Sequence, residues 1–208
     1  MKPDRLIYVA DPMCSWCWGF APVMAALEAL YLSRCELSLI VGGLRPGPHA
    51  RPLDSVFRAE LAHHWDQVEA RTGQPFTRKL LERNDFLYDT EPAAQAVVTV
   101  RSLAPELEYA YFYRLQEAFY VRNDDITRRS TLTALAATLG LEETAFTEAY
   151  DKVGCTRLAW EDFAAARDLG VQGFPTLLLE RKAALHLITR GYQPLEPIRS
   201  LLNGLLDS

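Results

Sequence analysis

The segment DPMCSWCWGF, at residues 11–20, constrains the fold more than any other part of the chain. It follows a run of β-branched and aromatic residues that predicts a buried strand over residues 5–10. A proline ends that strand, and residues 15–32 predict a helix because their apolar side chains recur with helical spacing. Cys14 and Cys17 therefore lie where a strand passes into a helix, with Cys14 at the helix N-terminus.

This position suits redox chemistry. Unpaired backbone N–H groups and the helix dipole favour a thiolate at Cys14. Cys17 lies one turn further along, so the two sulfur atoms can meet on one face of the helix. We expect Cys14 to be exposed and to attack a disulfide, and Cys17 to be more buried and to resolve the mixed disulfide that forms.

Two other interpretations of the pair stay open. The cysteines could be packed as small hydrophobic side chains, or they could form half of a zinc site. A zinc site needs two more ligands, and no second pair at the expected spacing occurs among the remaining cysteines and histidines: Cys35, Cys155, His49, His63, His64 and His186. We therefore expect no metal site. Cys35 and Cys155 are expected to be isolated buried thiols, although a disulfide between them stays open.

The composition excludes several classes of protein. The chain has 208 residues, of which 49% are hydrophobic, enough for a substantial core. A net charge of −5 argues against a surface that binds nucleic acid. No apolar run is long enough for a membrane span, and the N-terminus lacks the features of a signal peptide. We therefore expect a cytoplasmic protein without nucleic-acid or membrane partners.

The order of predicted elements indicates an α/β chain interrupted by helices. Further strands are predicted at residues 36–41, 176–179 and 185–188, and the last two read as a hairpin. No strand is expected from residue 54 to residue 151. Six of the predicted helices lie at or within this interval, and the last two follow it. The predicted helices are 54–71, 75–83, 91–103, 106–121, 130–139, 142–152, 156–169 and 194–206.

A second motif, GVQGFPTLLL at residues 170–179, places Pro175 at the start of a strand. From these residues alone, the Phe174–Pro175 bond is expected to be trans, because cis bonds are the minority before proline.

The two motifs together resemble the DsbA-like family of thioredoxin-fold oxidoreductases. DPMCSWCWGFAP is similar to the FrnE-like cytoplasmic branch, whose members read Asp-x-x-Cys-x-Trp-Cys. The resemblance implies a thioredoxin-like fold, formed by residues 1–50 and 155–208, with an inserted all-helical domain at 51–154. It also implies that Pro175 is cis and faces the cysteines, and that the backbone of Phe174 pairs with a bound substrate strand.

The chain departs from the family pattern at two places. Tyr8 stands where well-known members carry a buried acid, and Ser15-Trp16 lacks the histidine found between the cysteines of the periplasmic oxidant. Asp11 is the nearest acid, and it is either a turn residue before a proline or a group that supports proton handling at Cys17.

Aromatic residues surround the cysteine pair. Trp18 and Phe20 are expected to belong to the core, whereas Trp16, between the cysteines, is expected to be partly exposed and to contact substrate. Arg45, in the Gly/Pro-rich segment after the second predicted strand, either binds an acidic group such as a glutathione carboxylate or is a solvated loop residue.

The resulting hypothesis is a thiol–disulfide oxidoreductase, acting as oxidase, reductase or isomerase through Cys14 and Cys17 without a cofactor. Its substrate would be a protein or a small molecule that carries a thiol or disulfide, with thioredoxin or glutathione as electron partner. Two alternatives are an enzyme of the glutathione-transferase or isomerase type acting on small molecules, and a redox-inactive adaptor that binds peptides. The direction of electron flow depends on the redox poise of the compartment and not on the motif.

Overall fold

The computed structural model describes residues 3–207, apart from the side chain of Val153. Its centre is a four-stranded sheet in the order β2-β1-β5-β6. The strands are β1 (Asp4–Ala10), β2 (Cys35–Val41), β5 (Thr176–Arg181) and β6 (Ala184–Arg190). β1 runs parallel to β2 and antiparallel to β5, and β6 completes a hairpin with β5. All four strands contain the ranges predicted from the sequence.

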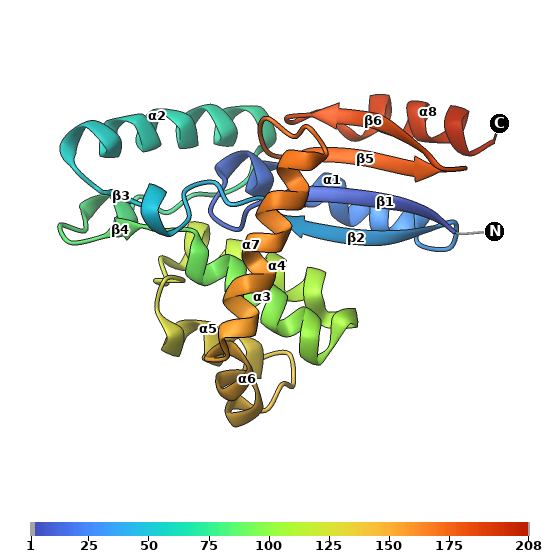
Figure 1. Cartoon of the computed structure of the whole chain (residues 1–208). Helices are drawn as coiled ribbons and strands as arrows, with labels where there is room; N and C mark the ends of the chain where they lie inside the picture. The colour runs from blue at the N-terminus through green and yellow to red at the C-terminus, as the bar shows by residue number, and fades with distance from the viewer. Residues whose placement is uncertain (1–2, 208) are drawn as a thin grey trace.

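Helices cover both faces of this sheet (Figure 1). α1 (Ser15–Tyr31) and α8 (Leu195–Leu206) lie on one face, and α7 (Val153–Asp168) crosses the other. Alternation along β1 explains the division, because neighbouring side chains of a strand point to opposite faces. Tyr8 belongs to the large core shared with α1, and Ile7 and Val9 pack with Ala166 of α7.

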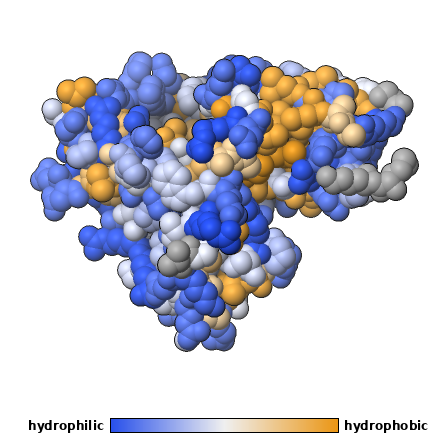
Figure 2. Space-filling model, in the orientation of Figure 1, coloured by the Kyte–Doolittle hydropathy of each residue, from blue (hydrophilic) through white to orange (hydrophobic). Residues whose placement is uncertain are grey.

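The face under α7 is only partly covered. Figure 2 shows a hydrophobic area over the sheet beside this helix. Leu185 and Leu187 of the edge strand β6 are exposed, and Leu187 is paired with Leu178 of the cluster that contacts α7.

A mostly helical insertion separates β2 from α7, and Figure 1 shows most of it projecting from one side of the sheet. Its elements are η1 (Gly47–His49), β3 (Arg51–Pro52), α2 (Ser55–Thr72), η2 (Lys79–Glu82), β4 (Leu87–Tyr88), α3 (Glu91–Leu103), η3 (Pro105–Leu107), α4 (Glu108–Glu117), η4 (Ala118–Arg122), α5 (Arg129–Ala137) and α6 (Glu143–Tyr150). No helix among residues 3–207 is both long enough and apolar enough to cross a membrane.

The insertion differs from the sequence prediction in one strand pair. β3 and β4 form a small antiparallel sheet of two residues each, so the expectation of no strand between 54 and 151 is wrong at Leu87–Tyr88. Two residues are too few to show the alternation by which strands are recognised in sequence.

The predicted helix over residues 75–83 is also wrong, because only the short 3-10 helix η2 forms there. Tertiary hydrogen bonds occupy the preceding backbone. The indole nitrogen of Trp18 donates to the carbonyl of Pro75 at 3.0 Å, and the N–H of Thr77 donates to the carbonyl of Tyr120 at 2.7 Å. These contacts join distant segments, so helix propensity could not reveal them.

A partly buried ion pair joins the insertion to the sheet. The guanidinium of Arg101, on α3, donates to both carboxylate oxygens of Asp162, on α7, at 2.9 and 2.7 Å. The same carboxylate accepts the backbone N–H of Val41 at the end of β2, and Arg101 also donates to Glu108 on α4. The helices α3, α4 and α7 therefore meet the C-terminal end of β2 at one charged cluster.

Candidate functional site

Cys14 is the N-cap residue of α1, as predicted. Its backbone is extended, and its carbonyl accepts the N–H groups of Cys17 and Trp18 at 3.0 and 3.1 Å. The helix therefore begins directly after Cys14, which lies at the end of α1 where the first-turn N–H groups have no partner within the helix, although its side chain makes no capping hydrogen bond. Cys17 follows one turn later, and all four cysteines of the chain are free thiols.

The two thiols differ in accessibility, and the pKa of Cys17 is shifted. Cys17 has no exposed surface, and burial raises the pKa of its thiol well above the ordinary value, with a hydrogen bond and a charge interaction from Cys14 raising it further. Cys14 is 7% exposed, so it is the more accessible of the pair but not the exposed side chain that the sequence led us to expect. The difference arises because the loops after β2 and before β5 close over it.

The loop before β5 lies against Cys14. The Phe174–Pro175 peptide bond is cis, as the family resemblance implied and contrary to the expectation from residues alone. The thiol of Cys14 donates to the carbonyl of Phe174 across 3.7 Å, although the two residues are 160 positions apart. The sheet order places β5 beside β1, so the loops at the adjacent ends of these strands meet.

Asp11 joins two loops of the site. One carboxylate oxygen accepts the N–H of Met13 at 2.9 Å, which is the expected turn role, and the other accepts the N–H of Leu44 at 2.7 Å. The side chain is fully buried, and burial raises the pKa of its carboxyl to about 6, although both N–H donors and Thr90 act in the opposite direction. The carboxylate thus connects the cysteine turn to the Gly/Pro-rich segment after β2.

A cavity of about 600 Å³ opens beside Cys14. Its walls come from the cysteine turn, the segment after β2, α2, β4, α7 and the loop before β5. The lining residues are Met13, Cys14, Ser15, Trp16, Gly42, Gly43, Leu44, Arg45, Pro46, His49, Phe57, Glu60, Leu61, His64, Tyr88, Trp160, Phe163, Ala166, Arg167, Val171, Gln172, Gly173 and Phe174.

The sequence interpretation did not assign most of these walls to the site. The expected βαβ order could have indicated one of these walls. Parallel strands end at the same edge of a sheet, and Ala10 pairs with Val41 at that edge. The segment after Val41 must therefore lie beside the segment after Ala10. The side chain of Arg45, which follows, makes no ion pair among the described residues and lies over the ring of Phe57 at 4.8 Å.

Trp16 is half-buried, as expected, and separates the cavity from a second hollow. This hollow, of about 510 Å³, is lined by Trp16, Gln67, Arg71, Phe174, Gly191 and Tyr192. The centroids of the Trp16 and Tyr192 rings lie 6.1 Å apart. Trp18 and Phe20 are buried in the core, which confirms the prediction for both.

The remaining cysteines and histidines form no second centre in the part of the chain that the structure describes. Cys35 and Cys155 are buried, separate thiols, and no disulfide joins them. No group of three His, Cys, Asp or Glu side chains among residues 3–207 is arranged to hold a metal ion.

The sequence profile of the DSBA-like thioredoxin domain matches residues 5–203. The chain belongs to the DSBA-like thioredoxin domain family. The predicted family and the thioredoxin-like fold with its helical insertion are thereby confirmed, and the FrnE-like branch stays a prediction.

Two solved structures resemble the chain over nearly its whole length. A protein from Nitrosomonas europaea, provisionally assigned as a protein disulfide isomerase, is 38% identical, with a TM-score of 0.92 over 99% of this chain and 98% of the other. The cytosolic disulfide reductase DsbM from Pseudomonas aeruginosa is 30% identical, with a TM-score of 0.83 over 98% of each chain. A second DsbM structure contains GSH.

A more distant relative carries a different description. The ClpXP adapter protein SpxH of Halalkalibacterium halodurans is 21% identical over 85% of this chain. The match covers 58% of that protein, so the chain spans little more than half the length of this curated relative.

Proposed function

We propose that this protein is a cytoplasmic thiol–disulfide oxidoreductase in which Cys14 attacks the substrate and Cys17 resolves the mixed disulfide. The observation that carries the proposal is the position of Cys14, at the N-terminus of α1 and 3.7 Å from the Phe174 carbonyl. A thiolate there lies at the positive end of the helix dipole and beside a backbone segment suited to pairing with an extended peptide.

In the proposed reaction, the Cys14 thiolate attacks one sulfur of a substrate disulfide. The substrate S–S bond breaks, one substrate thiol leaves, and a mixed disulfide forms on Cys14. Cys17 then loses its proton and attacks the Cys14 sulfur, which releases the second substrate thiol and leaves a Cys14–Cys17 disulfide. Two electrons pass from the protein to the substrate, and two molecules of an external thiol return the pair to the dithiol form.

The cavity beside Cys14 favours glutathione as that external thiol. Arg45 and Arg167 line it with cationic groups, and Glu60 lines it with a carboxylate. Glutathione carries two carboxylates, which Arg45 and Arg167 complement, whereas the Glu60 carboxylate is already paired with Arg51 at 2.8 Å. The complex of the related DsbM with GSH supports the same assignment. Trp16, Phe174 and Pro175 would contact the substrate around the reacting sulfur atoms.

Reduction of insulin by the wild type, Cys14→Ser and Cys17→Ser tests the assignment of the cysteines. We expect the wild type to reduce insulin with glutathione as electron donor and Cys14→Ser to be inactive. Cys17→Ser should retain a mixed disulfide on Cys14, which mass spectrometry detects. Equal activity of wild type and Cys14→Ser would reject the proposal and favour one of the other functions, a small-molecule enzyme or an adaptor.

A matched pair of arginine variants tests the glutathione site. Arg45 lines the cavity, whereas Arg157 is an exposed arginine that pairs with Glu161 on α7 and does not line it. We expect Arg45→Gln to raise the KM for glutathione about tenfold, the effect of losing one charged hydrogen bond, and Arg157→Gln to leave it unchanged. Equal KM values for both variants and the wild type, or a strong preference for thioredoxin, would reject glutathione as the partner of this cavity.

A further inference from the structure

Tyr8 places a buried hydroxyl without a partner beside the resolving cysteine. The side chain is 1% exposed, and its hydroxyl oxygen has no hydrogen-bond partner of ordinary geometry among the described residues. Buried polar groups are almost always paired, because an unpaired one loses its bonds to water without replacement. Such an exception in a redox site calls for a chemical explanation.

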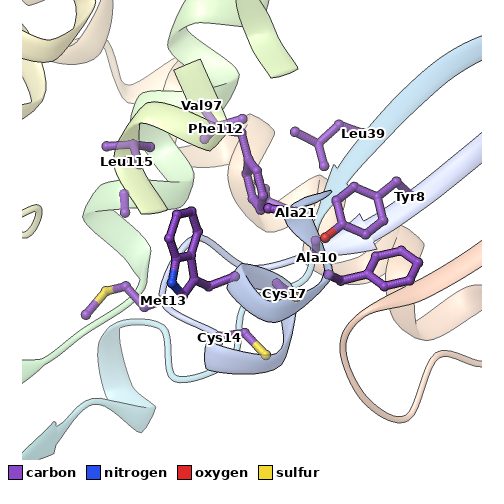
Figure 3. Close-up of a cluster of buried hydrophobic side chains, with 14 of the residues drawn as sticks. Tyr8, Ala10, Met13, Cys14, Cys17, Ala21, Leu39, Val97, Phe112 and Leu115 are labelled. Atoms are coloured by element: carbon purple, nitrogen blue, oxygen red, sulfur yellow. The ribbon is translucent and has the colours of Figure 1, made fainter. Parts of the chain in front are cut away.

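The packing around the ring fixes where this hydroxyl points. Phe20, Phe112 and Tyr109 surround the Tyr8 ring with centroid distances of 6.0, 6.1 and 6.4 Å. Phe20 and Cys17 are three residues apart on α1, so they lie on the same side of the helix. Figure 3 shows the Tyr8 hydroxyl directed toward the side of α1 that carries Cys17.

The pKa shifts of Tyr8 and Cys17 agree with a position of the Tyr8 hydroxyl near the Cys17 thiol. Burial raises the pKa of Tyr8 well above its ordinary value, and the charges of Cys17, Tyr109 and Cys14 raise it further. Cys17 is the largest of these charge effects. Cys14 and Asp11 are the other ionisable groups that act on Cys17. The Tyr8 hydroxyl therefore keeps its proton at neutral pH and has it available to donate to a hydrogen-bond acceptor.

Cys17 needs such a donor at one step of the proposed cycle. Its thiol must become a thiolate in a fully buried site, where desolvation disfavours the charged form. We propose that the Tyr8 hydroxyl donates a hydrogen bond to the Cys17 thiolate while Cys17 attacks the mixed disulfide on Cys14. The Cys14–substrate bond breaks, the Cys14–Cys17 bond forms, and the proton lost by Cys17 ends on the departing thiol.

This inference rests on the proposed function, and it gives the unpaired hydroxyl a role in the reaction. In the dithiol form the hydroxyl is poorly paired and should lower stability, whereas in the resolving step it gains a charged acceptor. Removing it should therefore improve folding and impair chemistry, a combination that a purely structural residue would not give.

Tyr8→Phe is the test variant, and Tyr111→Phe is its control. Tyr111 is equally buried, but its hydroxyl donates to the Leu132 carbonyl, away from the cysteines. We expect Tyr8→Phe to be as stable as the wild type or more stable, and to release substrate from the Cys14 mixed disulfide about tenfold more slowly. Tyr111→Phe should lose stability and release substrate at the wild-type rate.

A second measurement does not depend on turnover. In a Cys14→Ser background, the pH midpoint for alkylation of Cys17 should rise by about one pH unit when Tyr8 becomes phenylalanine. Unchanged release rate and midpoint would overturn the role of Tyr8. If the wild type forms no mixed disulfide at Cys14, the proposed function fails, and the alkylation midpoint still decides whether Tyr8 stabilises the Cys17 thiolate.

Discussion

The ring of Phe174 lies directly on the backbone of Gly42, so that a Cβ atom on Gly42 would be 2.1 Å from the ring atom Cε1. The loop before β5 and the segment after β2 therefore fit together only because this position has no side chain. The contact holds the Phe174 ring beside the cavity at Cys14.

Gly42→Ala should push the Phe174 ring away and disturb the loop that faces Cys14. We expect the free energy of unfolding to fall by about 1–3 kcal/mol, as for other overpacked sites, and insulin reduction to slow. Gly204→Ala is the control, because a Cβ there meets nothing within 4 Å. Wild-type stability and activity in Gly42→Ala would show that the ring can move without consequence.

Alkylation should distinguish the four cysteines. At neutral pH we expect Cys14 to react first, because it lines the cavity and lies at a helix N-terminus. Burial raises the pKa of Cys17 and of Cys35, which keeps both as unreactive thiols. Mass mapping after a brief exposure to iodoacetamide measures the order. Labelling of Cys17, Cys35 or Cys155 ahead of Cys14 would contradict the assignment.

Asp11 should make stability depend on pH. Its carboxyl pKa is about 6 in the folded chain against an ordinary value of 3.8, so the folded chain binds more protons between these values. The free energy of unfolding contributed by this group therefore falls as pH rises through that window, by up to about 3 kcal/mol.

Asp11→Asn removes this titration, and denaturant unfolding of both proteins at several pH values measures it. The stability of the wild type relative to the variant should decline from about pH 4 to about pH 6. A relative stability that stays constant across this window would show that Asp11 is not protonated there. Because Asn can accept only one of the two backbone N–H groups, the variant should also react more slowly at Cys14.

The ion pair between Arg101 and Asp162 should matter more for folding than its neighbours on the surface. Asp162→Asn leaves a partly buried guanidinium without its full partner, so we expect a loss of about 2 kcal/mol in the free energy of unfolding. The control is Glu161→Gln on the same helix, which breaks an exposed pair with Arg157 and should cost only a few tenths of a kcal/mol. Equal effects of both variants in denaturant unfolding would show that the cluster does not fasten the insertion.

Local patterns in the sequence predicted the regular elements well. The helix over residues 91–103 matches α3 at both ends, because a threonine, a proline and an acidic residue mark its start. The failures have a common cause. The short β3–β4 pair and the irregular backbone at residues 75–78 depend on hydrogen bonds to distant segments, which no local pattern contains.

The candidate site was predictable to a similar extent. Cys14, Cys17, Trp16 and the loop at Pro175 lie together, as the two motifs indicated. The second hydrogen bond of Asp11, to Leu44, could not be predicted, because it depends on the path of a loop whose glycines permit many conformations. The low exposure of Cys14 follows from the same loop.

The sheet order also has a consequence for synthesis on the ribosome. β1 pairs with β2 on one side and with β5 on the other, and the whole helical insertion lies between β2 and β5 in the chain. A nascent chain that ends before Thr176 therefore carries β1 as an open, hydrophobic sheet edge, which is a template for aggregation. Cys14 is added 160 residues before Phe174, the residue that lies against it. Until Phe174 has been added, the thiols of Cys14 and Cys17 exist without the loop that encloses them in the folded chain.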